Sequence, residues 1–162
     1  NITVVILDNK ITAMTGGQDH PGTGKTLRGE ETHEVNYEEL CNSIGVKWVK
    51  IVDSYDTGVL FQTLREATDF KGVSVLIAQR PCVLDPVKIK GPTLIVNPAT
   101  CTACQVCMNL GCPAITWIDE LFEDKHKVKI NPVSCIGCTL CAQICPSDCI
   151  QPLTPQAETT AV

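Results

Sequence analysis

The sequence predicts an α/β unit built on a parallel sheet, followed by a small, cysteine-rich α+β unit. Short β-branched runs alternate with helical segments up to Pro92, whereas nine of the eleven cysteines lie beyond it. The intervening stretch 83–92 is rich in proline and glycine, as domain junctions often are. A chain of 162 residues can hold two small domains. We therefore expect one domain over 1–92, a second over 93–154 and a tail over 155–162.

Each element of the first unit has its own signal. Ile2–Leu7 is a nearly continuous apolar run, typical of a strand buried on both faces of a parallel sheet. A helix is expected to begin at Asn36, with a glutamate three residues on as in a capping box. This helix would carry four apolar residues on one face: Tyr37, Leu40, Cys41 and Ile44. Further strands are expected over 46–52 and 73–78, and a second helix over about 57–70.

The order strand, helix, strand, helix, strand predicts right-handed crossovers and a parallel sheet. Three strands and two helices are few for a complete doubly wound domain. We therefore expect the C-terminal half of a larger α/β domain.

Eight cysteines form two runs with nearly identical spacing. The second run, from Cys135 to Cys145, has the pattern C-x2-C-x2-C-x3-C-P, and the first, from Cys101 to Cys112, has one extra residue before its fourth cysteine. This is the ligand spacing of bacterial-type two-cluster ferredoxins, in which the fourth cysteine of each run ligates the other cluster. We expect Gly111 to accommodate the extra residue through an unusual backbone angle.

The spacing therefore predicts two 4Fe-4S clusters with crossed ligands. The first cluster is expected to take Cys101, Cys104, Cys107 and Cys145. The second is expected to take Cys135, Cys138, Cys141 and Cys112. A proline follows each crossing cysteine, which suits a chain that must turn without continuing as a helix.

Zinc and disulfide bonds are the competing explanations for the cysteines. Zinc sites favour C-x2-C pairs separated by a long spacer, which fits triplets with a proline-flanked fourth cysteine poorly. Disulfides need an oxidising compartment, whereas nothing at the start of the sequence resembles a signal peptide and three thiols are left over. We expect iron-sulfur clusters and a cytoplasmic protein. Of the other thiols, Cys41 is expected to be buried and inert, and neither Cys82 nor Cys149 has a histidine nearby in sequence that would make it a nucleophile.

The charge of the chain limits its partners. The formal net charge is -5 with thiols counted as neutral, so bound clusters make the second unit more acidic still. This argues against nucleic acid or anionic membranes as partners. No apolar stretch approaches the length needed to span a bilayer.

A polar, glycine-rich stretch from Asp8 to Glu34 follows the first predicted strand. Ligands bind beyond the carboxyl ends of parallel strands, so this long loop is a candidate binding segment. Gly24-Lys25-Thr26 matches the end of a Walker motif, but Asp19 stands where the template requires glycine. A carboxylate there would lie against phosphates, so we do not expect nucleotide hydrolysis.

The same loop resembles the thiamine-diphosphate domain of indolepyruvate:ferredoxin oxidoreductase, α subunit. The resemblance lies in LDNxxTAMTGxQxHPGTG, from Leu7 to Gly24, and in Arg80-Pro81-Cys82 before the junction. In that family a ferredoxin module follows the thiamine domain, so the resemblance covers the whole chain. It implies a C-terminal fragment of that subunit: part of the thiamine-diphosphate-binding domain, then the two-cluster ferredoxin domain.

The resemblance implies a site for thiamine diphosphate and Mg²⁺ that this sequence holds only in part. Asn9 would supply a side-chain oxygen and Ile11 a carbonyl, which are the hard ligands that Mg²⁺ takes. Thr12 and Met14 belong to the same loop, and Met14 is consistent with an apolar wall for an aryl substrate. The Gly-Asp-Gly motif that supplies a further ligand is absent. His20 is the candidate acid-base group, with an ordinary solvated histidine as the alternative.

The implied activity is thiamine-dependent oxidative decarboxylation of a 2-oxo acid, an aryl pyruvate such as indolepyruvate, to an acyl-CoA. Electrons would pass through the two 4Fe-4S clusters to an external ferredoxin, in anaerobic metabolism. The implied partners are a β subunit in a hetero-oligomer, ferredoxin, the 2-oxo acid and coenzyme A. The alternatives are a non-catalytic electron-transfer subunit that docks to a separate oxidoreductase, and a zinc-stabilised interaction module.

Overall fold

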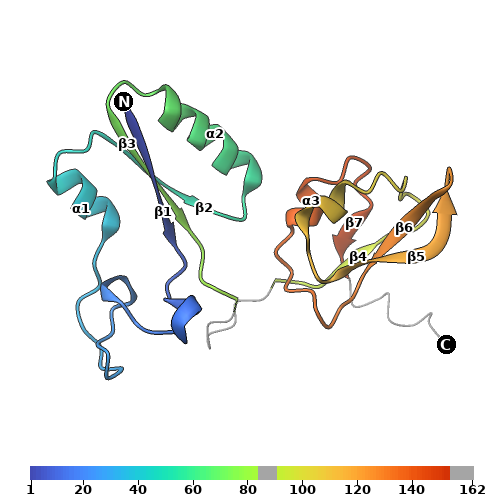
Figure 1. Cartoon of the computed structure of the whole chain (residues 1–162), viewed down its shortest axis with the longest axis horizontal. Coiled ribbons are helices and arrows are strands. Elements are labelled where there is room, and N and C mark those ends of the chain that lie inside the picture. The colour runs from blue at the N-terminus through green and yellow to red at the C-terminus, as the bar shows by residue number, and fades with distance from the viewer. Residues whose placement is uncertain (84–90, 154–162) are drawn as a thin grey trace. The chain divides into compact units, whose positions relative to one another are not determined.

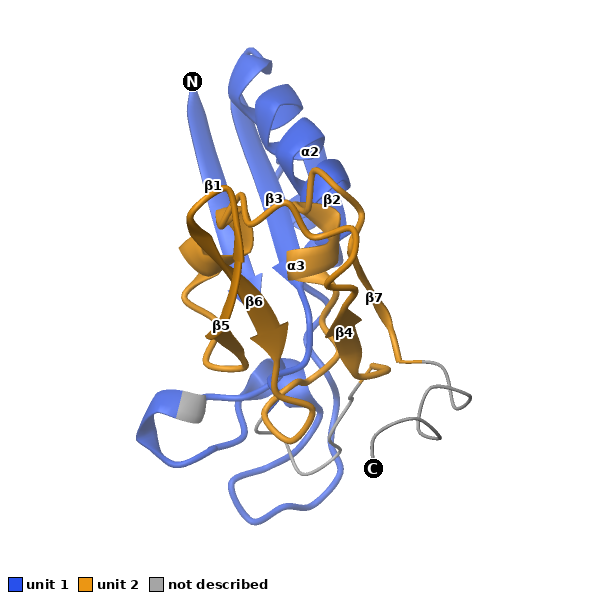
Figure 2. Cartoon of the chain, turned by 90° about the vertical axis from the view of Figure 1, so that its right-hand side faces the viewer, with its two compact units in different colours: residues 1–89 blue, residues 90–162 orange. Residues whose placement is uncertain are grey.

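The chain divides into two compact units, residues 1–89 and 90–162 (Figure 2). The computed structural model describes residues 1–83 and 91–153. The predicted tail and most of the predicted junction lie outside these ranges, and the domain limits at residues 92 and 154 stay a prediction. No helix in the described part of the chain has the length and apolar character that a membrane crossing needs.

The first unit is built on a three-stranded parallel sheet, as the sequence predicts. The strands are β1 (Ile2–Asp8), β2 (Trp48–Asp53) and β3 (Val73–Gln79), and their order is β1-β3-β2 (Figure 1). The last residues of the three strands pair in register. The carboxyl ends of all three therefore meet at one edge, where the loop after β1 begins.

Two helices cover opposite faces of this sheet. On one face α1 (Tyr37–Ser43) packs its Cys41 against Val75 and Ile77 of β3. On the other face, α2 (Thr57–Asp69) accepts a hydrogen bond at the Ala67 carbonyl from the Ser74 hydroxyl, at 2.7 Å. Successive side chains of a strand point to opposite faces, so β3 contributes alternate residues to the two layers.

The predicted helix start is confirmed, but the predicted apolar face is only partly right. The Asn36 side-chain oxygen accepts the backbone N–H groups of Glu38 and Glu39, at 3.0 and 3.1 Å. Cys41 is buried, whereas 51% of Leu40 and 73% of Ile44 is exposed. The helix is only two turns long and lies over β2 and β3. Cys41 enters the core and Tyr37 packs against it partly buried, whereas the other two predicted side chains stay exposed.

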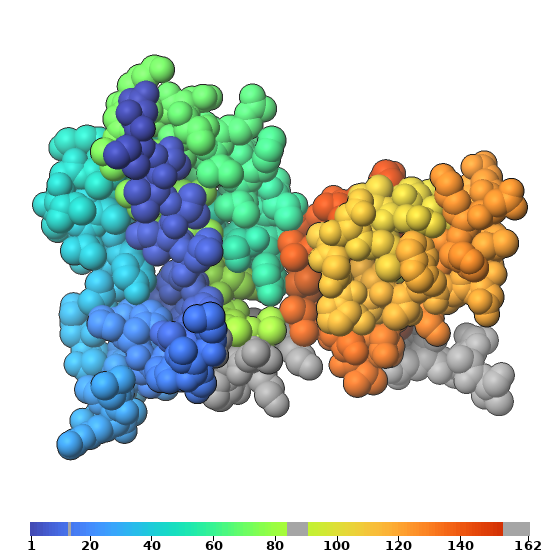
Figure 3. Space-filling view, viewed as in Figure 1, coloured from blue at the N-terminus to red at the C-terminus, as the bar shows by residue number. Residues whose placement is uncertain are grey.

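The expectation that the first strand is buried on both faces is wrong for the described chain. Ile2 is 62% exposed on one face of the sheet and Leu7 is 79% exposed on the other. In the described residues β1 pairs with β3 along one edge only, and the helices lie mainly over β2 and β3. Much of β1, in dark blue, is accordingly open at the surface (Figure 3).

The second unit consists of two small antiparallel sheets around a core rich in cysteine. One sheet pairs β4 (Leu94–Val96) with β7 (Ile150–Pro152), and the other is the hairpin of β5 (Ile115–Phe122) and β6 (Lys125–Ile130). A 3-10 turn, Val106–Leu110, and the short helix α3 (Leu140–Gln143) lie within the two cysteine runs. The buried core joins both sheets to the runs: Leu94, Cys101, Cys107, Ala114, Ile115, Val128, Ile130, Cys141, Cys145, Cys149 and Ile150.

Each cysteine run is introduced by the same turn. An Asn-Pro pair stands four residues before the first cysteine, at Asn97 and at Asn131. The asparagine carbonyl accepts the N–H of that cysteine, at 3.1 Å for Cys101 and 3.0 Å for Cys135. The asparagine side chain accepts the N–H two residues on, at 3.0 and 2.9 Å. The two runs are thus structural as well as sequence repeats.

Backbone hydrogen bonds also connect the start of each run to the end of the other. The N–H of Asn97 donates to the carbonyl of Cys149 at 2.7 Å, and that of Asn131 donates to Ala114 at 2.8 Å. Each run therefore begins beside the residues that follow the fourth cysteine of the other run. This is the arrangement that crossed cluster ligands require.

The cap at Asn36 predicts a measurable stability effect. We expect Asn36→Ala to lower the free energy of unfolding of the first unit by about 1 kcal/mol, because two N–H groups lose their partner. Urea unfolding followed by Trp48 fluorescence in a Trp117→Phe background measures this unit alone. Asn42→Ala, an exposed change in the same helix, should stay within about 0.5 kcal/mol of the parent. Equal effects of the two changes would contradict the role of the cap.

Candidate iron-sulfur centres and cofactor loop

The four cysteines predicted to hold the first cluster line one cavity. These are Cys101, Cys104, Cys107 and Cys145. Three of them come from the first run, and the fold brings the fourth from the end of the second. The remaining wall comes from Ala103 and Gln105 of the first run, from β6 and from the residues that follow Cys145, including Ser147 and Cys149.

The electrostatic neighbours of two buried thiols separate the cysteines into the same two sets. Burial raises the pKa of Cys107, and the thiols of Cys104, Cys101 and Cys145 raise it further. Burial and the thiols of Cys138, Cys112 and Cys135 raise the pKa of Cys141 to about 11. Four thiolates this close repel one another, so a cationic iron core favours their ionised form.

The first thiol set surrounds a cavity. Among the described residues, no three His, Cys, Asp or Glu side chains are close enough to hold one metal ion. A tetrahedral zinc site, with Zn–S bonds of about 2.3 Å, would bring its sulfurs to within about 3.8 Å of each other. A core of several iron and sulfide atoms is wider than one ion. A cluster therefore accepts a wider spacing of its four sulfurs than zinc does.

Left-handed backbone shapes both cysteine loops at matching positions. Ala103 (φ 49°) and Gln105 (φ 64°) in the first loop correspond to Gly137 (φ 69°) and Thr139 (φ 64°) in the second. Non-glycine residues rarely adopt such angles, and they persist where the surroundings impose them. Gly111 is also left-handed, at φ 61°, and ends the 3-10 turn after Cys107. The unusual backbone angle predicted for Gly111 is thus confirmed.

The second loop packs against the chain that precedes β4. The N–H of Gly91 donates to the Ile136 carbonyl at 3.0 Å. A Cβ on Gly137 would lie 2.3 Å from the Gly91 carbonyl carbon, and one on Gly91 would lie 2.2 Å from the Gly137 oxygen. Only glycine fits at either position.

The predicted Mg²⁺ ligands lie together at the carboxyl end of β1. Asn9 is exposed, and its side-chain oxygen accepts the N–H of Ile11 at 3.2 Å. The Asn9 carbonyl accepts the N–H of Cys82 at 2.9 Å, which ties the loop to the residues after β3. An accessible amide oxygen and a neighbouring backbone carbonyl are ligands that suit Mg²⁺. The residues present therefore fit their predicted role.

The buried carboxylate of Asp8 organises this edge of the sheet. It accepts hydrogen bonds from the Gln79 side chain at 2.7 Å and from the Lys10 backbone at 3.1 Å, and Lys10 Nζ lies 3.2 Å away. Burial alone would raise the pKa of Asp8, but these hydrogen bonds and the Lys10 charge outweigh it and hold that pKa below its usual value. The Asp8 charge is therefore balanced within the fold, and the exposed Asn9 remains the candidate ligand.

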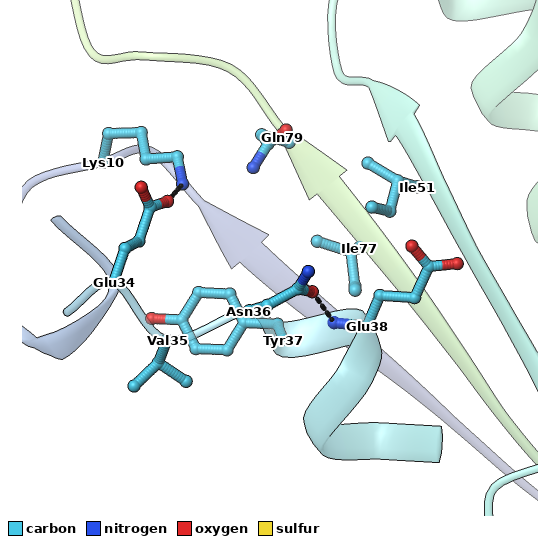
Figure 4. Close-up of a pocket in the computed structure, with 9 residues that line it drawn as sticks. All are labelled: Lys10, Glu34, Val35, Asn36, Tyr37, Glu38, Ile51, Ile77 and Gln79. Atoms are coloured by element: carbon cyan, nitrogen blue, oxygen red, sulfur yellow. Dashed lines mark hydrogen bonds and ion pairs between the residues drawn. The ribbon is translucent and has the colours of Figure 1, made fainter. Parts of the chain in front are cut away.

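Lys10 extends the network to the far end of the loop. Its Nζ lies 2.7 Å from Glu34 Oε1 and 3.4 Å from the Gly22 carbonyl. Figure 4 shows the ion pair with Glu34 at the rim of a cavity of about 360 Å³ that also contains Tyr37, Ile77 and Gln79. The cavity lies between the loop, the start of α1 and the end of β3. The loop after β1 is thus closed by a salt bridge at its base.

A second cavity, of about 430 Å³, opens at the same edge beside β2 and β3. Arg80, in its wall, pairs with Asp53 at 2.6 Å, and its guanidinium lies 4.4 Å from the centre of the Tyr55 ring. The predicted family segment around Arg80 therefore contributes a fixed positive charge at the carboxyl edge of the sheet.

His20 caps the 3-10 turn Pro21–Thr23. Its Nδ1 accepts the N–H of Gly22 at 3.1 Å and lies 3.4 Å from the Tyr37 hydroxyl. An acceptor at Nδ1 assigns the proton of the neutral ring to Nε2. His20 is held in place rather than freely solvated, and Nε2 is the atom available for proton transfer.

Thr12 and Met14 occupy a separate small turn. The Thr12 N–H donates to the Gln18 carbonyl at 3.0 Å, and the Thr12 carbonyl accepts the N–H of Gly17 at 3.1 Å. Met14 is 95% exposed and lines none of the cavities described above. The structure therefore brings Asn9 and Ile11 together but does not bring Met14 into their surroundings.

Sequence reasoning missed the residues that hold the predicted ligands in place. Asp8 and Gln79 were recognisable only as the polar residues that follow two predicted strands, and their contact follows from the parallel register. The repeated Asn-Pro at Asn97 and Asn131 was a signal visible in the sequence. The contact of Cys149 with Cys145 had no sequence signal beyond proximity.

Comparisons with known proteins agree with both units. The family model described as the C-terminal TPP-binding domain of thiamine pyrophosphate enzymes matches residues 1–78, and the 4Fe-4S dicluster domain matches residues 93–146. The chain thus joins a thiamine-diphosphate-binding domain with a parallel sheet to a ferredoxin-like domain. These matches confirm the predicted cofactors, thiamine diphosphate and two 4Fe-4S clusters.

Within that class the chain is similar to the indolepyruvate oxidoreductase subunit IorA. It is 40% identical to IorA of Pyrococcus abyssi over 158 residues, which are 93% of this chain and 24% of that protein. It is 38% identical to IorA of Thermococcus kodakarensis, over 94% of this chain and 24% of that protein. A ferredoxin of Rickettsia felis is 34% identical over 64 residues, 40% of this chain and 55% of the ferredoxin. The chain spans about a quarter of the length of the IorA relatives.

The close contact of Gly91 and Gly137 predicts a selective defect. Gly137→Ala should displace the second cysteine loop, so the reconstituted chain should keep about four of about eight irons. Gly111→Ala is the matched control, because it has a similar φ but open space around its Cβ. It should cost about 1 kcal/mol of stability and keep both clusters. Equal iron loss in both variants, by iron assay, would contradict the steric explanation.

The low pKa of Asp8 predicts acid sensitivity of the first unit. A carboxyl whose folded pKa lies below its unfolded value, about 3.9, stabilises the fold above that value, and the effect is lost as pH falls through the folded pKa. We expect Asp8→Asn to lower stability at pH 7 and to flatten the decline between pH 5 and pH 3. Urea midpoints from Trp48 fluorescence test this, and parallel profiles of variant and parent would contradict it.

Proposed function

We propose that the chain is part of a 2-oxo acid:ferredoxin oxidoreductase that acts on aryl pyruvates such as indolepyruvate. The observation that carries the proposal is the combination, in one chain, of a thiamine-type loop at the sheet edge and two crossed thiol sets. The IorA relatives, whose printed name is indolepyruvate oxidoreductase subunit, support the substrate class. The proposed partners are a β subunit, coenzyme A and an external ferredoxin.

In this proposal the first unit binds the organic cofactor and its metal. The Asn9 side chain and the Ile11 carbonyl are proposed to hold Mg²⁺, and Lys10 fixes the loop between them through its contacts with Asp8 and Glu34. Bound thiamine diphosphate would supply the carbon chemistry of decarboxylation. His20 is proposed to donate or accept a proton at Nε2, since its Nδ1 is occupied by the Gly22 N–H.

The second unit is proposed to conduct the electrons. Cys101, Cys104, Cys107 and Cys145 would ligate one 4Fe-4S cluster, and Cys135, Cys138, Cys141 and Cys112 the other. Two clusters that each accept one electron can divide a two-electron oxidation into single transfers. A one-electron acceptor such as ferredoxin requires this division.

The full-length complex gives the test of this function. We expect aryl pyruvates to reduce ferredoxin, or a dye in its place, in a reaction that depends on coenzyme A and thiamine diphosphate. Asn9→Ala should lower the rate roughly tenfold or more at limiting cofactor, because the metal loses an oxygen ligand. His33→Ala, an exposed change in the same long loop, should leave the rate unchanged.

Metal analysis separates the alternatives. Anaerobic reconstitution should give about eight irons per chain, and stoichiometric zinc without iron would refute the cluster assignment. A complex that carries its iron but oxidises no 2-oxo acid would support the electron-transfer subunit instead.

A further inference from the structure

Two polar side chains meet a predicted cluster ligand without belonging to either ligand set. Cys149 Sγ lies 3.4 Å from Cys145 Sγ, and Ser147 Oγ lies 3.6 Å from the same sulfur. Both residues line the cavity that the first thiol set surrounds. Cys149 is only 3% exposed, so the contact with Cys145 is made away from water.

Ligation decides the direction of these hydrogen bonds. A cysteine binds iron as the thiolate, which has no proton and can only accept. If Cys145 is a ligand, as the proposed function requires, the Ser147 hydroxyl and the Cys149 thiol must be the donors. Two side-chain hydrogen bonds then converge on one ligand sulfur of the first cluster.

The corresponding positions after the other crossing cysteine carry no buried donor. Ala114 follows Cys112-Pro113 as Ser147 follows Cys145-Pro146, and alanine has no donor. Thr116 takes the place of Cys149, but it is exposed at the start of β5. The two clusters, although held by repeated loops, therefore have different surroundings at their crossing ligands.

We propose that Ser147 and Cys149 hydrogen-bond to the Cys145 thiolate and hold the first cluster at a higher reduction potential than the second. A donor at a ligand sulfur stabilises negative charge, and the reduced cluster is the more negative state. Each reduction adds one electron to the cluster and breaks no bond. An electron shared by the two clusters then resides mainly on the first.

Redox titration of the reconstituted full chain, followed by EPR spectroscopy, tests this proposal. In Cys149→Ala we expect the ratio of reduced to oxidised first cluster, at fixed ambient potential, to fall at least threefold. This corresponds to about 28 mV, since tenfold is about 59 mV for one electron. Ser147→Ala should act in the same direction. Cys149→Ser keeps a donor and should restore most of the shift.

The controls separate a hydrogen-bond effect from a structural one. Cys41→Ala removes a buried thiol from α1 and should leave both potentials unchanged. The higher of the two potentials should fall in the Cys149 and Ser147 variants, and the lower should stay constant. Unchanged potentials, an equal fall in both, or a fall of the lower one alone would overturn the proposal.

Iron content distinguishes failure of this inference from failure of the proposed function. Variants that keep about eight irons report on the hydrogen bonds alone. If Cys149→Ala loses iron, the potentials of Ser147→Ala test the proposal instead, because Ser147 is partly exposed and its truncation disturbs the core less. A parent chain that binds no iron refutes the proposed clusters before any potential is measured.

Discussion

The exchange of backbone hydrogen bonds between the two cysteine runs is the constraint on which the second unit depends. The bonds from Asn97 to Cys149 and from Asn131 to Ala114 place the start of each run beside the end of the other. A tight C-x2-C-x2-C loop can direct three thiols to one centre but cannot supply the fourth. Because the exchange is reciprocal, each run helps to position the fourth cysteine of the other thiol set.

A comparable constraint organises the first unit, but it is electrostatic. Three parallel strands bring their last residues to one edge, where the ionised Asp8 is held by Gln79 and Lys10. The same Lys10 closes a loop of more than twenty residues through Glu34. The Asp8 carboxylate is bound by Gln79 and Lys10 within the fold, whereas the adjacent Asn9 exposes a neutral amide oxygen. This division explains how two neighbouring polar residues at one strand end can have different roles.

The sequence predicts the features that depend on neighbouring residues, but not those that depend on contacts between distant segments. The cap at Asn36 and the left-handed Gly111 were predicted because each depends on a few adjacent residues. The burial of the first strand was predicted wrongly, since apolar composition shows what a strand can bury but not what covers it. The network of Asp8 and the contact of Cys149 with Cys145 depend on register between separate segments, which no local pattern contains.

The two units should therefore respond to different stresses. The first has an exposed apolar strand and one buried ion pair, so its stability rests on a thin core and on the charge of Asp8. The second has short strands and a core in which five of the eleven buried residues are cysteines. The raised pKa of Cys141 means that its ionised form, which binds iron, is favoured only with a cation nearby. Acid acts first on the hydrogen bonds of one unit, whereas oxidation or chelation removes the centre of the other. Loss of the clusters can then precede any unfolding of the parallel sheet.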